Sequence, residues 1–97
     1  MYEIKYSPGS LKDLESLPKI IAQKIFNTLH EFRDIDSKSN NNLFFEPLEG
    51  FPKEKLFKTR IGSYRAIFKI FHDEKIVYFI LIDNRSVIYK RLKKMLK

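Results

Sequence analysis

The chain has 97 residues, no cysteine, and 19 lysines and arginines against 12 aspartates and glutamates, which gives a formal net charge of +7. This length predicts a single domain over residues 1–97, and the lack of cysteine excludes disulfides, thiolate catalysis and cysteine-ligated zinc. The positive charge favours phosphate-rich polymers or an acidic protein as partners. The longest apolar run, at 76–82, is far below the ~20 residues that span a bilayer. We therefore expect a cytoplasmic protein without a membrane partner.

The N-terminal residues predict a strand followed by a short helix. The segment 2–6 alternates polar and apolar residues and is closed by Pro8-Gly9, which is typical of a short strand. Ser10 and Asp13 fit a capping box. Three leucines at helical spacing then predict a helix that Pro18 ends.

A second helix is predicted from Lys19 to about residue 35, because apolar residues recur there three and four positions apart. It would form a hairpin with the first helix. The polar segment 36–42, DSKSNNN, has neither a helical nor a strand period. We expect it to be an exposed connector.

The segment 57–69, FKTRIGSYRAIFK, predicts a β-hairpin closed by the two-residue loop Gly62-Ser63. This loop sets Arg60 opposite Arg65 and sends alternate side chains to opposite faces. One face is suited to the core and carries Phe57, Thr59, Ile61, Tyr64, Ala66 and Phe68. The other face carries four cations: Lys58, Arg60, Arg65 and Lys69. Since residues 55–72 contain no carboxylate, a polyanion is the natural counter-charge for this face.

The C-terminal third predicts a buried strand and a basic end. HDEK at 72–75 makes a turn, and 76–82 is apolar enough for a central strand buried on both faces. A basic segment that ends in a helix follows. The expected fold class is α+β: a two-helix N-terminal hairpin packed on a small antiparallel sheet of about four strands, with a basic C-terminal segment.

The stretch LFKTRIGSYRAIFKI, followed about twenty residues later by ILIDNRSVIYKRL, resembles the RelE/ParE toxin superfamily of type II toxin–antitoxin pairs. The matching positions are Lys58, Arg60, Gly62, Tyr64 and Arg65, with Arg85 and Tyr89 near the C-terminus. The resemblance implies a RelE-like fold over nearly the whole chain. It also implies a cognate antitoxin that forms a hetero-oligomer with the toxin. In this superfamily, RelE-like members cut mRNA on the ribosome, whereas ParE-like members poison DNA gyrase.

If this chain is similar to the RelE-like members, its catalytic residues are Lys58, Arg60, Arg65, Arg85 and Tyr89. Attack of a ribose 2′-OH on its own phosphodiester passes through a phosphorane-like state, whose extra negative charge fixed cations stabilise. Arg65 and Arg60 would hold the scissile phosphate and Lys58 would take part in proton transfer. Arg85 would hold or protonate the leaving side, and Tyr89 would stack on a base or approach the phosphate.

Three further cations are expected to bind RNA around that site: Lys69, Lys90 and Arg91. No cofactor is expected. No metal is expected either, because the acidic pairs Asp34/Asp36 and Asp73/Glu74 lack a histidine or third carboxylate at ligand spacing.

One position departs from the pattern of the active relatives. Many of them carry histidine where this chain has Asn84, which cannot act as a general base. Glu46 and Glu49 are alternative carboxylates that could reach the site. The predicted function is that of a type II toxin, a ribosome-dependent mRNA endonuclease that inhibits translation. The alternatives are a DNA gyrase poison without nuclease activity and a non-catalytic RNA-binding module.

Overall fold

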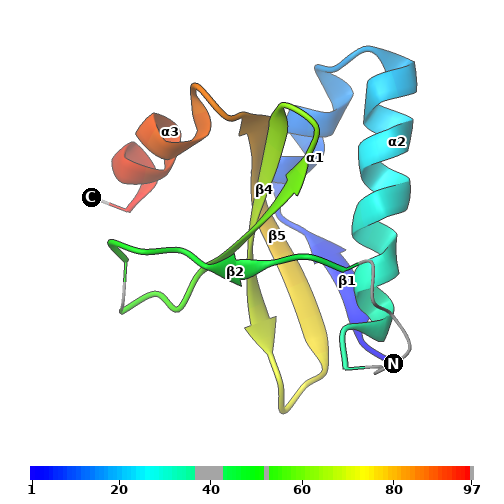
Figure 1. Ribbon diagram of the computed structural model, residues 1–97, viewed down its shortest axis with the longest axis vertical. Helices are drawn as coiled ribbons and strands as arrows, with labels where there is room; N and C mark the ends of the chain where they lie inside the picture. Colours follow the sequence, from blue (N-terminus) through cyan, green and yellow to red (C-terminus); the bar gives the residue numbers. More distant parts are fainter. Residues whose placement is uncertain (37–42, 52, 97) are drawn as a thin grey trace.

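The structure is a computed structural model that describes residues 1–36, 43–51 and 53–96. The strands are β1 (Glu3–Tyr6), β2 (Glu46–Pro47), β3 (Phe57–Ile61), β4 (Tyr64–Phe71) and β5 (Ile76–Asn84). The helices are α1 (Pro8–Glu15), α2 (Lys19–His30), the 3₁₀ helix η1 (Glu31–Asp34) and α3 (Ile88–Met95). The strands form one sheet in the order β1-β5-β4-β3-β2. Figure 1 shows α1 and α2 on one side of this sheet and α3 on the other.

The predicted α+β class and RelE-like arrangement are confirmed, with two differences in the sheet. β1 pairs with β5 in parallel, with Glu3 opposite Ile76 and Tyr6 opposite Phe79, so the sheet is mixed and not antiparallel throughout. The two-residue strand β2 adds a fifth strand beside β3. The alternation of a strand specifies its two faces but not its neighbour, which is why neither pairing follows from the pattern. The predicted connector lies outside the described residues from position 37 onward.

The capping box predicted at Ser10 and Asp13 is wrong, because α1 begins earlier. Ser7 is the N-cap, and its side chain accepts a hydrogen bond from the Ser10 N–H at 3.0 Å. Pro8 occupies the first turn, where its missing N–H leaves no bond unmade. Asp13 does not take part in the cap, and its Oδ2 instead accepts a hydrogen bond from the Ile82 N–H at 3.0 Å. α1 thus lies along β5 beyond the end of β1.

Apolar side chains fill both sides of the sheet. Between the sheet and α1, α2 and η1, the rings of Phe32, Phe68 and Phe79 pack with centroids 5.1–5.7 Å apart. A second cluster lies beneath α3 and consists of Leu48, Leu56, Ile67, Ile80, Leu81, Ile88 and Leu92. The face of the sheet that carries the cations is therefore covered by α3 over part of its area.

A β-bulge in β5 changes which way the end of that strand faces. Ile67 pairs with Leu81 and Phe68 pairs with Phe79, so Ile80 is an extra residue in β5. Ile80 and Leu81 both belong to the cluster beneath α3, whereas Phe79 and Ile82 belong to the other core. A bulge re-aims the residues that follow it. Asp83, next after Ile82, consequently lies on the α3 side of the sheet.

Candidate functional site

The hairpin register predicted from the sequence is confirmed. β3 and β4 pair with Ile61 opposite Tyr64 and Arg60 opposite Arg65. Gly62 has a φ of +61°, the angle that the first loop position of a type II′ turn requires. The register brings the Lys58, Arg60 and Arg65 side chains to one face of the hairpin.

The two opposed arginines each have a partner of their own. The Arg60 guanidinium carbon lies 5.7 Å from the ring centroid of Phe44, within cation–π range. The Arg65 Nη1 donates hydrogen bonds to the carbonyl oxygens of Gly62, at 3.1 Å, and Tyr64, at 2.9 Å. These contacts offset part of the repulsion that a directly opposed like-charge pair creates.

Lys58 is held between a carboxylate and an aromatic ring. Its Nζ lies 3.4 Å from Glu46 Oε1, an ion pair between neighbouring positions of β2 and β3, and 5.7 Å from the Tyr89 ring centroid. The lysine therefore links β2 to α3 across the hairpin. Of the two carboxylates considered from the sequence, Glu46 is the one that contacts a predicted catalytic residue.

The turn between β5 and α3 holds Arg85 next to the hairpin loop. The Arg85 N–H donates to the Ser63 carbonyl oxygen at 2.9 Å. Asn84 Oδ1 accepts bonds from the Ser86 N–H, at 3.0 Å, and from the Ser86 hydroxyl, at 2.9 Å. Asn84 therefore shapes the turn that leads into α3.

All five residues predicted to be catalytic line a single open cavity of about 510 Å³. The complete lining is Phe44, Glu46, Lys58, Thr59, Arg60, Arg65, Arg85, Ser86 and Tyr89. The cavity thus combines four cations, a carboxylate and two aromatic rings, which suits a phosphate with an adjoining base. We call it the cationic cavity.

Phe44 was missed by the sequence analysis. Phe44 is 56% exposed, whereas its neighbour Phe45 packs against the core. The buried Thr59 hydroxyl donates to the Phe44 carbonyl oxygen at 2.6 Å, which attaches this segment to β3. Residues 43–45 are all apolar, so no alternation in the sequence distinguishes Phe44 from its neighbours.

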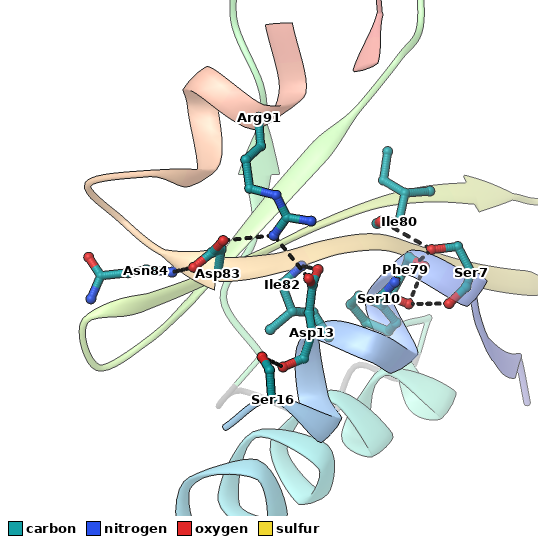
Figure 2. A network of polar contacts seen from close by, with 10 residues as sticks. All are labelled: Ser7, Ser10, Asp13, Ser16, Phe79, Ile80, Ile82, Asp83, Asn84 and Arg91. Carbon is teal, nitrogen blue, oxygen red and sulfur yellow. Dashed lines mark hydrogen bonds and ion pairs between the residues drawn. The ribbon is translucent and has the colours of Figure 1, made fainter. Parts of the chain in front are cut away.

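The residues expected to bind RNA lie outside the lining of the cationic cavity. Lys69 is opposite Tyr78 further along β4, and Lys90 is exposed on α3. Arg91 Nη1 lies 2.7 Å from Asp83 Oδ2 and 3.0 Å from Asp13 Oδ1 (Figure 2). Burial lowers the pKa of Arg91, but the hydrogen bonds to Asp83 and Asp13 raise it by more, so its pKa rises overall. RNA binding by these three residues stays a prediction.

The two histidines lie away from the cationic cavity. His30 ends α2 and stacks on Phe26 with ring centroids 5.7 Å apart, and His72 is 3.0 Å from the Tyr2 hydroxyl. Within residues 1–36, 43–51 and 53–96, no three acidic or histidine side chains gather as metal ligands. No helix in this described part is long and apolar enough to span a membrane.

Comparison with solved structures places the fold among RelE toxins. The RelB–RelE complex from Methanococcus jannaschii matches with a TM-score of 0.67 at 22% identity, over 90% of this chain and 96% of that one. The RelE–RelB complex from Pyrococcus horikoshii matches with 0.62 at 27% identity, over 88% and 96%. The RelBE2 complex from Mycobacterium tuberculosis matches with 0.64 at 24% identity, over 87% and 98%. No curated protein sequence matches the chain significantly.

The fold is therefore that of the RelE/ParE toxin superfamily. The model of one family, described as the ParE toxin of the type II toxin–antitoxin system parDE, matches residues 4–89. The chain belongs to this family of type II toxins.

Proposed function

We propose that this toxin is a metal-independent endoribonuclease that cuts mRNA in the ribosomal decoding site and thereby stops translation. The observation that carries the proposal is the joint lining of one cavity by Lys58, Arg60, Arg65, Arg85 and Tyr89. Four cations around one cavity can stabilise the negative charge that develops in a phosphorane-like state. A pocket that binds a neutral ligand has no need of four cations in its lining.

The proposed cleavage needs a base, which Asn84 cannot supply. Glu46 is the carboxylate of the cationic cavity, and we assign it to accept the 2′-hydroxyl proton. The 2′-oxygen then bonds to phosphorus, the bond to the 5′-oxygen breaks, and the Lys58 ammonium gives that oxygen a proton. The products are a 2′,3′-cyclic phosphate and a 5′-hydroxyl. The 3.4 Å contact between Glu46 and Lys58 lets the carboxyl return its proton to the amine afterwards.

The other side chains bind and orient the RNA in this proposal. Arg65 and Arg60 hold the non-bridging phosphate oxygens, for which a planar guanidinium offers two parallel donors. Arg85 stabilises the leaving side. Tyr89 and Phe44 flank the cavity and stack on the bases next to the scissile phosphate.

A second candidate function is the poisoning of DNA gyrase without RNA cleavage. It is favoured by the description of the matching family as ParE toxins, and by the absence of a titratable side chain at Asn84. A gyrase poison binds the enzyme and leaves transcripts intact. The nuclease would therefore cut transcripts, whereas the gyrase poison would cause DNA damage.

The experiment follows a reporter transcript by primer extension after induction of the toxin, with DNA-damage signalling measured in the same culture. The nuclease predicts new 5′ ends within the translated region that vanish when initiation is blocked. Growth arrest with intact transcripts and a DNA-damage response would instead establish the gyrase poison. RNA binding in vitro with neither effect would leave the non-catalytic RNA-binding module.

We also propose an acidic cognate antitoxin as the protein partner, in a hetero-oligomer. The solved relatives from M. tuberculosis and M. jannaschii are toxin–antitoxin complexes, and the relative from P. horikoshii is a RelE–RelB complex. A groove of about 380 Å³ between α1 and α2 has a mainly apolar lining that includes Leu14, Leu17 and Phe26, and Ile20 on α2 is 85% exposed. Exposed apolar surface of this kind marks protein interfaces. Co-purification with the product of an adjacent gene tests the pair, and toxin that is harmless without a partner would contradict it.

A further inference from the structure

Arg65 and Asp83 are directly opposed across β4 and β5. The bulge at Ile80 turns Asp83 to the α3 side of the sheet, the side on which Arg65 lies. Directly opposed residues have Cβ atoms about 4.5–5.5 Å apart, and opposite charges there attract. An ion pair between Arg65 and Asp83 would be the ordinary outcome, yet in the described part of the chain the two side chains form none.

Asp83 has other partners for both of its oxygens. Its Oδ2 accepts a hydrogen bond from Arg91 Nη1 at 2.7 Å, and its Oδ1 accepts one from the Asn84 N–H at 2.7 Å. Figure 2 shows the Arg91 side chain reaching from α3 to the end of β5, where Asp83 and Asp13 converge on it. Asp13 is itself fixed by the Ile82 N–H. Arg91 is thus held in place by a second carboxylate from α1.

Arg65 keeps most of its donors as a result. Both of its hydrogen bonds use Nη1 and run to the carbonyl oxygens of Gly62 and Tyr64. Among the described residues, Nε and Nη2 have no hydrogen-bond partner in the protein, and a guanidinium presents five N–H groups in all. Arg65 is one of the residues that line the cationic cavity.

We propose that Arg91 is a positioning residue: by binding Asp83, it prevents that carboxylate from pairing with Arg65 and so keeps Arg65 available for a phosphate. The inference rests on the proposed function for the identity of that phosphate as the scissile one. Without the Arg91 charge, Asp83 turns to its cross-strand neighbour and competes with the phosphate for the same guanidinium.

The test measures phosphate binding at Arg65 directly, and does not depend on cleavage. The Arg65 Nε–H signal in the ¹⁵N spectrum of the purified toxin, assigned with Arg65→Lys, is followed during titration with inorganic phosphate. Arg91→Gln removes the charge but keeps an amide that can donate to the carboxylates. We expect it to weaken phosphate binding at Arg65 by about 3- to 5-fold, the upper end of the scale for one cross-strand charge pair.

Rescue separates positioning from the other roles that Arg91 could have. Arg91→Gln combined with Asp83→Asn should return phosphate affinity to within about twofold of wild type, because no carboxylate then competes for Arg65. Arg91→Gln combined with Asp73→Asn has the same net charge as the first double variant, but Asp73 lies in the distant β4–β5 turn. This second combination should not restore phosphate affinity. The matched control is Lys94→Gln, which removes one charge from an exposed position of α3.

Several results would overturn the inference. An unchanged phosphate affinity in Arg91→Gln excludes the competition. Rescue that fails with Asp83→Asn, or succeeds equally with Asp73→Asn, assigns the effect to Arg91 itself or to net charge. Asp83→Asn alone should bind phosphate at least as well as wild type, so a loss there contradicts the proposal even if Arg91→Gln does not fold.

Cleavage on ribosomes is measured with the same variants. If wild type leaves transcripts uncut while phosphate binding follows the predicted order, the nuclease proposal fails and the role of Arg91 stands. If wild type cuts and Arg91→Gln binds phosphate normally, the proposed role of Arg91 fails and the nuclease proposal stands.

Discussion

Arg60 and Arg65 are opposed across the β3–β4 hairpin, and each guanidinium has a neutral partner. The Phe44 ring lies beside Arg60 and the carbonyl oxygens of Gly62 and Tyr64 accept from Arg65. Neutral partners reduce the repulsion without cancelling the charge. The hairpin therefore keeps a net positive charge, and the resulting potential attracts a phosphate.

Arg65→Ala should abolish translation-dependent mRNA cleavage while the protein remains folded. The side chain lies outside both apolar clusters, so its loss leaves no core cavity, and it removes the repulsion with Arg60. We expect a loss of about 10²- to 10³-fold, the usual effect of deleting one preorganised donor. Primer extension measures the cleavage. Arg65→Lys should recover part of the activity, since an ammonium lacks the bidentate fork.

A thermal melt and an antitoxin-binding assay control for folding in this series. If Arg65→Ala cuts as well as wild type, the hairpin cations are not the catalytic centre, whatever the fold.

Glu46→Gln should reduce cleavage by about 10²- to 10⁴-fold, because the amide cannot accept the 2′-hydroxyl proton. The ion pair with Lys58 is lost as well, but both side chains are partly exposed, and such pairs contribute less than about 1 kcal/mol to the free energy of unfolding. Single-turnover cleavage on programmed ribosomes is the measurement. Were Glu49→Gln to lose activity and Glu46→Gln to keep it, the base would be the other carboxylate.

Phe44→Ala should weaken binding of a single-stranded RNA by about 10- to 100-fold, which corresponds to stacking of one base on the ring. Phe44 is 56% exposed, so the fold should tolerate the removal of its ring. Phe44→Tyr should keep the affinity. Phe71→Ala is the matched control, because Phe71 is 42% exposed at the far end of β4. Equal losses from the Phe44 and Phe71 variants would show that stacking at the cavity is not the cause.

Tyr6→Phe should stabilise the protein and change its response to alkali. The Tyr6 hydroxyl is buried without a hydrogen-bond partner in the described part of the chain, and burial raises the pKa of Tyr6 to about 12. Removing an unpaired buried hydroxyl should add about 1 kcal/mol to the free energy of unfolding near neutral pH.

The sign of the pH effect follows from the raised pKa. The unfolded chain loses the Tyr6 proton near pH 10 and the folded chain near pH 12, so the wild-type protein loses stability as the pH rises from 10 to 12. The phenylalanine variant lacks this loss. Urea unfolding of both proteins at pH 8, 10 and 11.5 measures it, and a difference between them that stays constant over this range would contradict the assignment.

Local sequence patterns were enough to predict the β3–β4 hairpin. The two-residue loop at Gly62-Ser63 and the period of two in the flanking strands were enough to predict the register that the structure has. They also predicted that Lys58, Arg60 and Arg65 share a face. Both features depend on residues within a few positions of one another, so the sequence carries them directly.

The partners of those cations depend on segments distant in the sequence. β2 brings Glu46 to Lys58, and the turn before α3 attaches Arg85 to Ser63. No period or spacing encodes these contacts, because they follow from the order of strands in the sheet, which side-chain alternation leaves open.

The clearest case is Asp83. Strict alternation from Phe79 would put Asp83 on the face toward α1 and α2, away from Arg65. The extra residue at Ile80 reverses the facing of the strand end and brings Asp83 beside Arg65. Arg91, which the sequence presented as one cation in a basic tail, then binds Asp83 and Asp13 across the end of β5. Ile80 and Leu81, at this bulge, both pack in the cluster beneath α3, and that packing exists only in the folded chain.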